Sequence, residues 1–227
     1  MTLIGVDGCR GGWVAALTPG DFSAFAFEFI ERIDRVFASD AIIAIDIPIG
    51  LPAAGPRACD VAARQMLGRG QGSRVFPAPC RATLDGCSYA ACAELNWRTS
   101  GKKISKQTYG IMAKIREVDR AIAPALQTRI REAHPEGCFR LLNGSPLRHS
   151  KKTRAGQQER LTILTSNGVE FDPAVERQRL GRARVQLDDI IDAAVCLLTA
   201  KRVAEHSACV FGDGAVDSRG LRMEIVA

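Results

Sequence analysis

Residues 41–46 read Ala41-Ile42-Ile43-Ala44-Ile45-Asp46, an apolar run that ends in a single aspartate. Pro48, Gly50 and Pro52 follow within a few residues. A run that is apolar on both faces predicts a strand in a sheet covered on both sides, and prolines end such a strand. We therefore expect a buried central strand whose carboxyl end carries Asp46.

A second run of the same form stands at the start of the chain, as Leu3-Ile4-Gly5-Val6-Asp7. A glycine-rich turn and the apolar run Trp13–Leu17 follow it, which predicts a β-hairpin. After Pro19-Gly20, alternating phenylalanines indicate a third strand, and residues 30–38 are compatible with a helix. The expected order is three strands, one helix and then the central strand.

Asp7 and Asp46 are the first candidates for chemistry. Ligands and catalytic groups collect at the carboxyl ends of parallel strands. If the two strands are neighbours, both carboxylates share one small space, and two close like charges need a cation or a shared proton. The alternative for either residue alone is a turn aspartate that bonds to its own backbone.

A late apolar segment supplies two more aspartates, in Leu187-Asp188-Asp189-Ile190-Ile191-Asp192-Ala193. Asp189 and Asp192 are three residues apart and project from one side of the predicted helix. Asp188 or Asp189 could simply cap the helix. Asp192 lies beyond the first turn, so it needs a partner, either an arginine or a metal ion held with other acids.

The remaining segments of the chain predict further helices and strands, and some of them carry additional candidate residues. Residues 57–131 are mostly helical and resemble an insertion, interrupted by a loop at Gly68–Ser73 whose Arg69 or Arg74 could contact phosphate. Ala133–Leu142 is strand-like, and it carries Glu136, a possible fifth ligand or an arginine partner. The other expected elements are helices at Thr153–Thr165, Pro173–Gly181 and Asp188–Glu205 and a terminal strand at Arg222–Val226 that would close the sheet.

Composition limits the class of protein. The chain has 227 residues, of which 46% are hydrophobic and 25% charged, with a formal net charge of +6. Such a composition excludes disordered, collagen-like and coiled-coil chains. We expect no membrane segment and a cytoplasmic location, because the longest apolar stretches are short and no signal core follows Met1. The eight cysteines lack metal-ligand spacing, and those in apolar helical patterns, such as Cys59, Cys92 and Cys196, are expected to be core thiols.

The basic residues are unevenly distributed. Trp97–Arg131 carries nine basic and two acidic residues, and Arg148–Arg160 carries five basic and one acidic. Local excesses of this kind favour a phosphate-bearing partner, although ordinary solvated faces give the same pattern. The candidate phosphate contacts in these segments are Lys102, Lys103, Lys106, Lys151, Lys152 and Arg154.

Together these motifs resemble the RNase H-like superfamily, on the strength of Gly5-Val6-Asp7-Gly8, Ile45-Asp46 and Asp189-x-x-Asp192-Ala193. The last motif is similar to that of the RuvC Holliday-junction resolvases. Over nearly its whole length the chain resembles domain-of-unknown-function family four-two-nine, labelled a predicted nuclease, through stretches such as Gly8-Cys9-Arg10-Gly11-Gly12-Trp13, Ile47-Pro48-Ile49-Gly50 and His134-Pro135-Glu136.

The resemblance implies one RNase H-like α/β domain over residues 1–227, with a five-stranded mixed sheet flanked by helices and a helical insertion at about 57–131. It also implies that Mg²⁺ or Mn²⁺ is held by Asp7, Asp46, Asp189 and Asp192, with Glu136 as a further catalytic candidate. The chain departs from the resolvases at Asp46, where they carry a glutamate.

The expected function is hydrolysis of nucleic-acid phosphodiester bonds by a two-metal carboxylate mechanism. The substrate phosphate would contact Arg10, Arg74, Lys102, Lys151 and Lys152. DNA versus RNA, a small phosphoester instead of a polymer, and the oligomeric state stay open. A non-catalytic nucleic-acid or protein-binding module on the same scaffold is the alternative, and an actin-like ATPase is a third class that the chain length disfavours.

Overall fold

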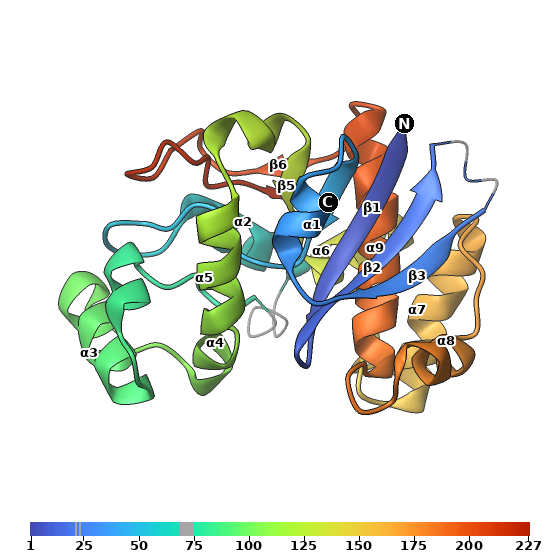
Figure 1. Ribbon diagram of the computed structural model, residues 1–227, viewed down its shortest axis with the longest axis horizontal. Coiled ribbons are helices and arrows are strands. Elements are labelled where there is room, and N and C mark those ends of the chain that lie inside the picture. Colours follow the sequence, from blue (N-terminus) through green and yellow to red (C-terminus); the bar gives the residue numbers. More distant parts are fainter. Residues whose placement is uncertain (21, 23, 69–74) are drawn as a thin grey trace. The chain divides into compact units, whose positions relative to one another are not determined.

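A computed structural model describes residues 1–20, 22, 24–68 and 75–227 (Figure 1). Arg69, Arg74 and most of the expected glycine-rich loop lie outside the described residues. The chain forms two compact units. The first comprises residues 1–47, 129–209 and 226–227, and the second comprises residues 48–128 and 210–225. Most of the stretch expected to be an insertion therefore falls in the second unit.

The first unit is built on a five-stranded mixed sheet in the order β3-β2-β1-β4-β5. The strands β1 (Thr2–Cys9), β2 (Gly12–Pro19) and β3 (Ala26–Ile30) are antiparallel neighbours. β4 (Ile42–Ile45) lies parallel to β1 on one side and to β5 (Ile130–Glu132) on the other. This confirms the α/β fold class and the five-stranded mixed sheet, which is consistent with an RNase H-like fold.

Helix α9 (Leu187–Ala204) packs against β1, β4 and β2, and Figure 1 shows it behind β1 and β2. Eleven consecutive residues of α9, from Ile190 to Ala200, are buried. A helix that is apolar all round has to be covered on every side. Its neighbours α6 (Pro135–Asn143), α7 (Arg154–Ser166) and α8 (Pro173–Leu180) supply that cover. The helices predicted at Thr153–Thr165, Pro173–Gly181 and Asp188–Glu205 are confirmed as α7, α8 and α9.

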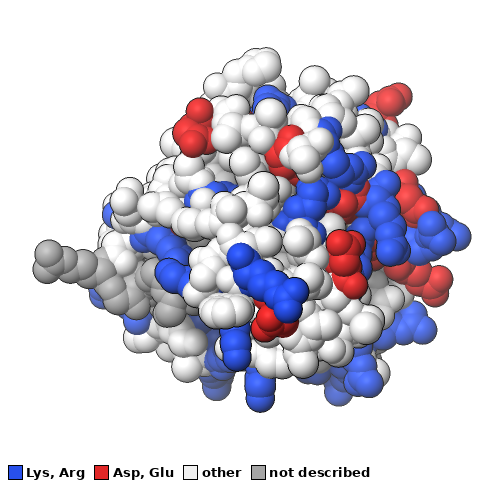
Figure 2. Space-filling view, turned by 90° about the vertical axis from the view of Figure 1, so that its left-hand side faces the viewer, with Lys and Arg blue, Asp and Glu red and all other residues white. Residues whose placement is uncertain are grey.

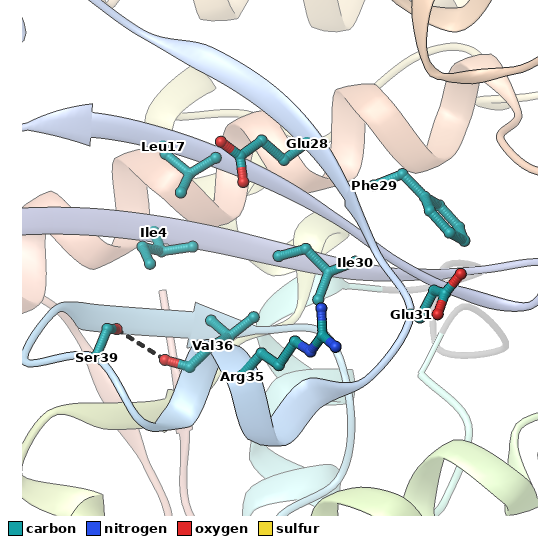
Figure 3. A pocket seen from close by; sticks show the side chains of 9 residues that line it. All are labelled: Ile4, Leu17, Glu28, Phe29, Ile30, Glu31, Arg35, Val36 and Ser39. Atoms are coloured by element: carbon teal, nitrogen blue, oxygen red, sulfur yellow. Dashed lines mark hydrogen bonds between the residues drawn. The ribbon is translucent and has the colours of Figure 1, made fainter.

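The opposite face of the sheet carries a short helix, α1 (Ile33–Phe37), beside Ile4 of β1 and Leu17 of β2 (Figures 1 and 3). Ile33, Val36 and Phe37 of this helix are buried. Side chains alternate between the two faces along each strand. The apolar residues of β1 are therefore divided between α9 and the α1 side, as the doubly apolar sequence predicts.

The prediction of a strand over Ala133–Leu142 is wrong. Only residues 130–132 pair in the sheet, and the chain then turns into α6. His134 caps this helix, with its Nδ1 accepting the backbone N–H of Gly137 at 3.4 Å, and Pro135 occupies the first helical position. Glu136 consequently lies in the first turn of a helix.

The second unit is mostly helical, as expected for residues 57–131. A buried ion pair joins Arg57 and Asp60 at its start, and Asp217 accepts the backbone N–H groups of Leu51 and Leu221. Its elements are α2 (Ala58–Leu67), η2 (Arg81–Asp85), α3 (Tyr89–Ser100), α4 (Lys106–Gly110), α5 (Met112–Ala121), η3 (Pro124–Thr128) and β6 (Val210–Phe211).

The terminal strand is shorter than predicted and does not close the main sheet. It spans Ile225–Val226 (β7) and pairs with β6 in a two-stranded sheet, while Val226 forms an isolated parallel bridge with Ala133. No helix within the described residues is long and apolar enough to cross a membrane.

Candidate functional site

The carboxyl ends of β1 and β4 bring Asp7 and Asp46 side by side. Val6 and Ile45 are register partners in the parallel pair, and the N–H of Asp46 donates to the carbonyl of Val6 at 2.9 Å. Each aspartate is the next residue along its strand. The two strands are therefore parallel neighbours, which meets the condition for a shared site, and both aspartates stand at the same edge of the sheet.

Gly5 lets α9 approach β1 closely enough to complete this site. A Cβ on Gly5 would stand 2.0 Å from the backbone nitrogen of Leu197 and 2.2 Å from the carbonyl oxygen of Ala193. Only a glycine fits such an approach, and a glycine inside a strand pattern is the sequence signal for it. Asp7 is two residues further along the same face, so it points toward the amino-terminal half of α9.

Asp7 interacts electrostatically with three other aspartates, one from β4 and two from α9. Burial raises the pKa of Asp7 well above its ordinary value, and the carboxylates of Asp46, Asp192 and Asp189 raise it further. The ammonium group of Lys151 opposes this shift. Four acids from β1, from the end of β4 and from α9 thus influence one another electrostatically.

The pKa values of the other three aspartates are raised as well. Burial and the nearby charge of Asp192 raise the pKa of Asp46 to about 7. Burial also raises the pKa of Asp192, and raises that of Asp189 to about 6. Buried carboxylates with raised pKa values are typical of functional sites, although buried ion-pair networks also produce them.

Lys151 lies against this cluster. Its Nζ donates to Oδ2 of Asp192 at 2.5 Å, and its side chain is about one-third exposed. Burial works against the charge, yet Asp192, Asp7 and Asp46 hold the pKa of Lys151 above its ordinary value. The sequence predicted a phosphate contact for Lys151, and it gave no sign of this ion pair with Asp192.

Asp192 is 1% exposed, and its second oxygen, Oδ1, is buried with no hydrogen-bond partner among the described residues. A buried, unsatisfied carboxylate oxygen is unfavourable by several kcal/mol unless a ligand completes it. Asp192 is therefore the residue of the cluster most in need of a further partner.

Asp189 also acts as a helix cap. Its Oδ2 accepts the backbone N–H of Gln186 at 2.8 Å, which closes a capping box at the start of α9. The capping alternative is thus confirmed for Asp189. Asp7 likewise uses Oδ1 to accept the N–H of Gly8 at 2.7 Å.

Glu136 is held by an arginine. Arg160, which is almost fully buried, donates to Oε1 of Glu136 at 2.5 Å. The alternative in which an arginine pairs with Glu136 is confirmed, although Glu136 lies on α6 and not on a strand. The charge of Glu136 still raises the pKa of Asp46 and of Asp192.

The predicted phosphate contacts belong to different parts of the chain. Arg10 is exposed at the β1–β2 turn, and Lys152 is exposed beside Lys151, both in the first unit. Lys102 belongs to the second unit, and Arg74 lies outside the described residues. Lys151 is therefore the predicted phosphate contact that joins the acidic cluster directly.

Among the described residues, no three Asp, Glu, His or Cys side chains are arranged as a ligand set for a metal ion. The donor chemistry nevertheless suits a hard cation, because all four acids offer carboxylate oxygens and one oxygen of Asp192 has no hydrogen-bond partner within the residues that the structure describes. Lys151 supplies a single positive charge at this cluster.

A hollow of about 540 Å³ lies elsewhere in the first unit (Figure 3). It is lined by Ile4, Leu17, Ile30 and Val36, with Glu28, Glu31 and Arg35 at its sides. Ile4 is the residue before Gly5, so it faces away from α9. This hollow is therefore on the opposite face of the sheet from the acidic cluster.

The fold and the cluster define an α/β protein with a five-stranded mixed sheet, consistent with an RNase H-like fold, and with four interacting aspartates where two parallel strands meet a buried helix. The chain belongs to the family described as "Protein of unknown function (DUF429)", whose model matches residues 5–215. No curated protein and no solved structure matches the chain.

Proposed function

We propose that the protein is a divalent-metal-dependent phosphodiesterase that hydrolyses nucleic acid. The observation that carries this proposal is the crowding of Asp7, Asp46, Asp189 and Asp192 beside Lys151, with one buried oxygen of Asp192 that has no hydrogen-bond partner in the described part of the chain. Four carboxylates and one ammonium leave an excess of negative charge, which Mg²⁺ or Mn²⁺ would offset.

In this proposal Asp7, Asp46 and Asp192 would hold the metal, with Asp189 contributing its charge while it caps α9. When bound, Mg²⁺ or Mn²⁺ supplies Lewis-acid chemistry for the attack of water on phosphorus and for the charge on the leaving oxygen. Lys151 would then be released from Asp192 to donate to a substrate phosphate oxygen. Arg10 and Lys152, both exposed in the same unit, are the other candidate donors.

A fluorogenic assay on labelled single-stranded and duplex oligonucleotides tests this function. We expect cleavage that needs Mg²⁺ or Mn²⁺, stops with EDTA, and is lost in Asp7→Asn and Asp192→Asn. Asp40→Asn is the matched control, because Asp40 is exposed and precedes β4, at the opposite end of that strand from Asp46. Absence of cleavage in the wild type on both substrates would refute the proposal.

A non-catalytic binding module is the second candidate, and the Lys151–Asp192 ion pair is the observation that favours it. In such a module Lys151 would be the permanent counter-ion of the cluster. Retained folding and unchanged nucleic-acid or protein binding in Asp7→Asn and Asp192→Asn, together with no hydrolysis by the wild type, would select this candidate.

A further inference from the structure

The second unit exposes a tryptophan at the end of α3. Trp97 is 51% exposed, more than Tyr89 or Phe76, the other exposed aromatic side chains of this unit's described residues. A large exposed aromatic side chain is unfavourable in water, and exposed tryptophans are typical of binding surfaces. Trp13, the other tryptophan of the chain, is fully buried.

The backbone around Trp97 is firmly held. The adjacent Asn96 is buried, accepts the N–H of Cys80 at 2.8 Å, and donates to the carbonyl of Lys102 at 2.7 Å. Gly101 ends the helix in the left-handed conformation, and its N–H donates to the carbonyl of Trp97 at 2.8 Å. The indole and the segment that carries Lys102 are thus fixed to the same helix end.

An aromatic contact holds the next helix in place. The rings of Tyr89 in α3 and Tyr109 in α4 meet edge to face at 5.4 Å, and the hydroxyl of Tyr89 donates to the carbonyl of Ile104 at 3.3 Å. Ser105 caps α4, and Lys106 is its first residue. The loop between the two helices is therefore ordered at both ends.

This segment is entirely basic in its charged residues. No acid occurs between Leu95 and Arg116, whereas Lys102, Lys103 and Lys106 are all exposed there. Arg98 is partnered by Glu94 at 2.8 Å, so the excess of positive charge near Trp97 comes from Lys102, Lys103 and Lys106, and Lys114 adds to it further along the segment. Figure 2 is viewed from the side on which Figure 1 draws α3, and Lys and Arg side chains are exposed on this face.

We propose that this surface, formed by Trp97, Lys102, Lys103 and Lys106, binds single-stranded nucleic acid. An exposed indole can stack on an unpaired base, and lysines at its side can contact the phosphates of the same strand. A duplex hides its base faces and would use the lysines alone. This inference goes beyond the proposed hydrolysis and does not depend on the acidic cluster.

Fluorescence anisotropy with a labelled 20-nucleotide oligothymidine, in EDTA, tests the inference on the full-length protein. We expect Trp97→Ala to weaken binding by about tenfold or more, and Trp97→Phe to retain part of the affinity because it keeps a ring. Lys102→Ala with Lys103→Ala should reduce the slope of log affinity against log salt by about 1.4, since each phosphate contact on a single strand contributes about 0.7. Lys201→Ala, in the other unit, is the charge control and should leave the affinity unchanged.

Intrinsic fluorescence adds a local readout, because Trp97 is the exposed tryptophan and Trp13 is buried. Binding should quench the emission of the wild type and not that of Trp97→Ala. Equal affinity of wild type and Trp97→Ala, tighter binding of a matched duplex, or binding to phosphatidylserine vesicles in place of the oligonucleotide would overturn the inference. The binding assay contains EDTA and needs no cleavage, so a wild-type protein that binds but does not cleave would refute only the proposed hydrolysis.

Discussion

Lys151 donates to one oxygen of Asp192 at 2.5 Å, while the other oxygen of the same buried carboxylate has no hydrogen-bond partner among the described residues. The two residues are 41 positions apart, and the lysine reaches the carboxylate from the loop before α7. A half-satisfied buried carboxylate beside three other acids is the physical basis of the account given above.

Removing the charge of Lys151 should destabilise the metal-free protein. Lys151→Met leaves Asp192 buried beside like charges, and we expect the free energy of unfolding to fall by about 1 to 2 kcal/mol, a value reduced for the partial exposure of the lysine. Urea unfolding in EDTA measures the change, and excess Mg²⁺ should restore most of it. An unchanged unfolding midpoint in EDTA would mean that the ion pair contributes nothing.

The stability of the metal-free protein should fall as pH rises through the titration of the cluster. Because burial and like charges raise the pKa of Asp46 to about 7 and that of Asp189 to about 6, the folded state binds more protons than the unfolded state at mildly acidic pH. The contribution of Asp46 and Asp189 to the free energy of unfolding therefore decreases between about pH 4 and pH 7. This interval lies between the pKa values of the unfolded and the folded state.

Thermal unfolding in EDTA at a series of pH values tests whether stability decreases as the pH rises. Other groups also titrate, so the comparison is with Asp46→Asn, which should show a smaller loss of stability with rising pH than the wild type. Asp40→Asn should follow the wild type. Parallel curves for wild type and Asp46→Asn would show that Asp46 does not titrate abnormally.

Gly5→Ala should disrupt the packing of α9 on β1. The new Cβ would overlap backbone atoms of Leu197 and Ala193, which no side-chain rotation relieves. We expect a loss of about 3 kcal/mol or more in the free energy of unfolding, at the upper end for overpacking. Gly110→Ala is the control, because a Cβ there meets nothing within 4 Å, and it should be neutral or slightly stabilising. Equal stability of the two variants would contradict this packing.

Asp217→Ala should weaken the second unit. Burial opposes ionisation of Asp217, but the N–H groups of Leu51, Leu221 and Arg219, with Arg81, hold its pKa below the ordinary value. The stability that Asp217 contributes is present above its unfolded pKa and is lost as pH falls through its folded pKa. We expect a loss of about 2 kcal/mol at pH 7, measured by urea unfolding, and a smaller difference from the wild type under strong acid. If the difference in free energy of unfolding between the wild type and Asp217→Ala grew on acidification, the pKa of Asp217 would not be lowered in the folded state.

Much of the fold could be predicted because its signals are local. The runs that end at Asp7 and Asp46 are apolar on both faces, and the helices after residue 153 are long and well bounded. The error at α6 arose from a short apolar run that suits a strand or a helix equally. Pro135 at the first helical position was the available signal for the helix.

The candidate site could be predicted less completely. The four aspartates could be identified as candidates because two of them end apolar strand runs and two are spaced three residues apart on a helix. These patterns depend only on residues close together in the sequence. The partners of Asp192 and Glu136, by contrast, come from Lys151 and Arg160, distant in the chain. Long-range side-chain pairing of this kind depends on how helices pack, which a single sequence does not specify.

Titration calorimetry with Mn²⁺ on the metal-free protein tests the central claim most directly. The account predicts saturable binding by the wild type and by Asp40→Asn, with affinity reduced about tenfold or more in Asp7→Asn and in Asp192→Asn, as expected for losing groups that hold a metal. No binding heat in the wild type at millimolar Mn²⁺, or equal binding in all four proteins, would contradict it.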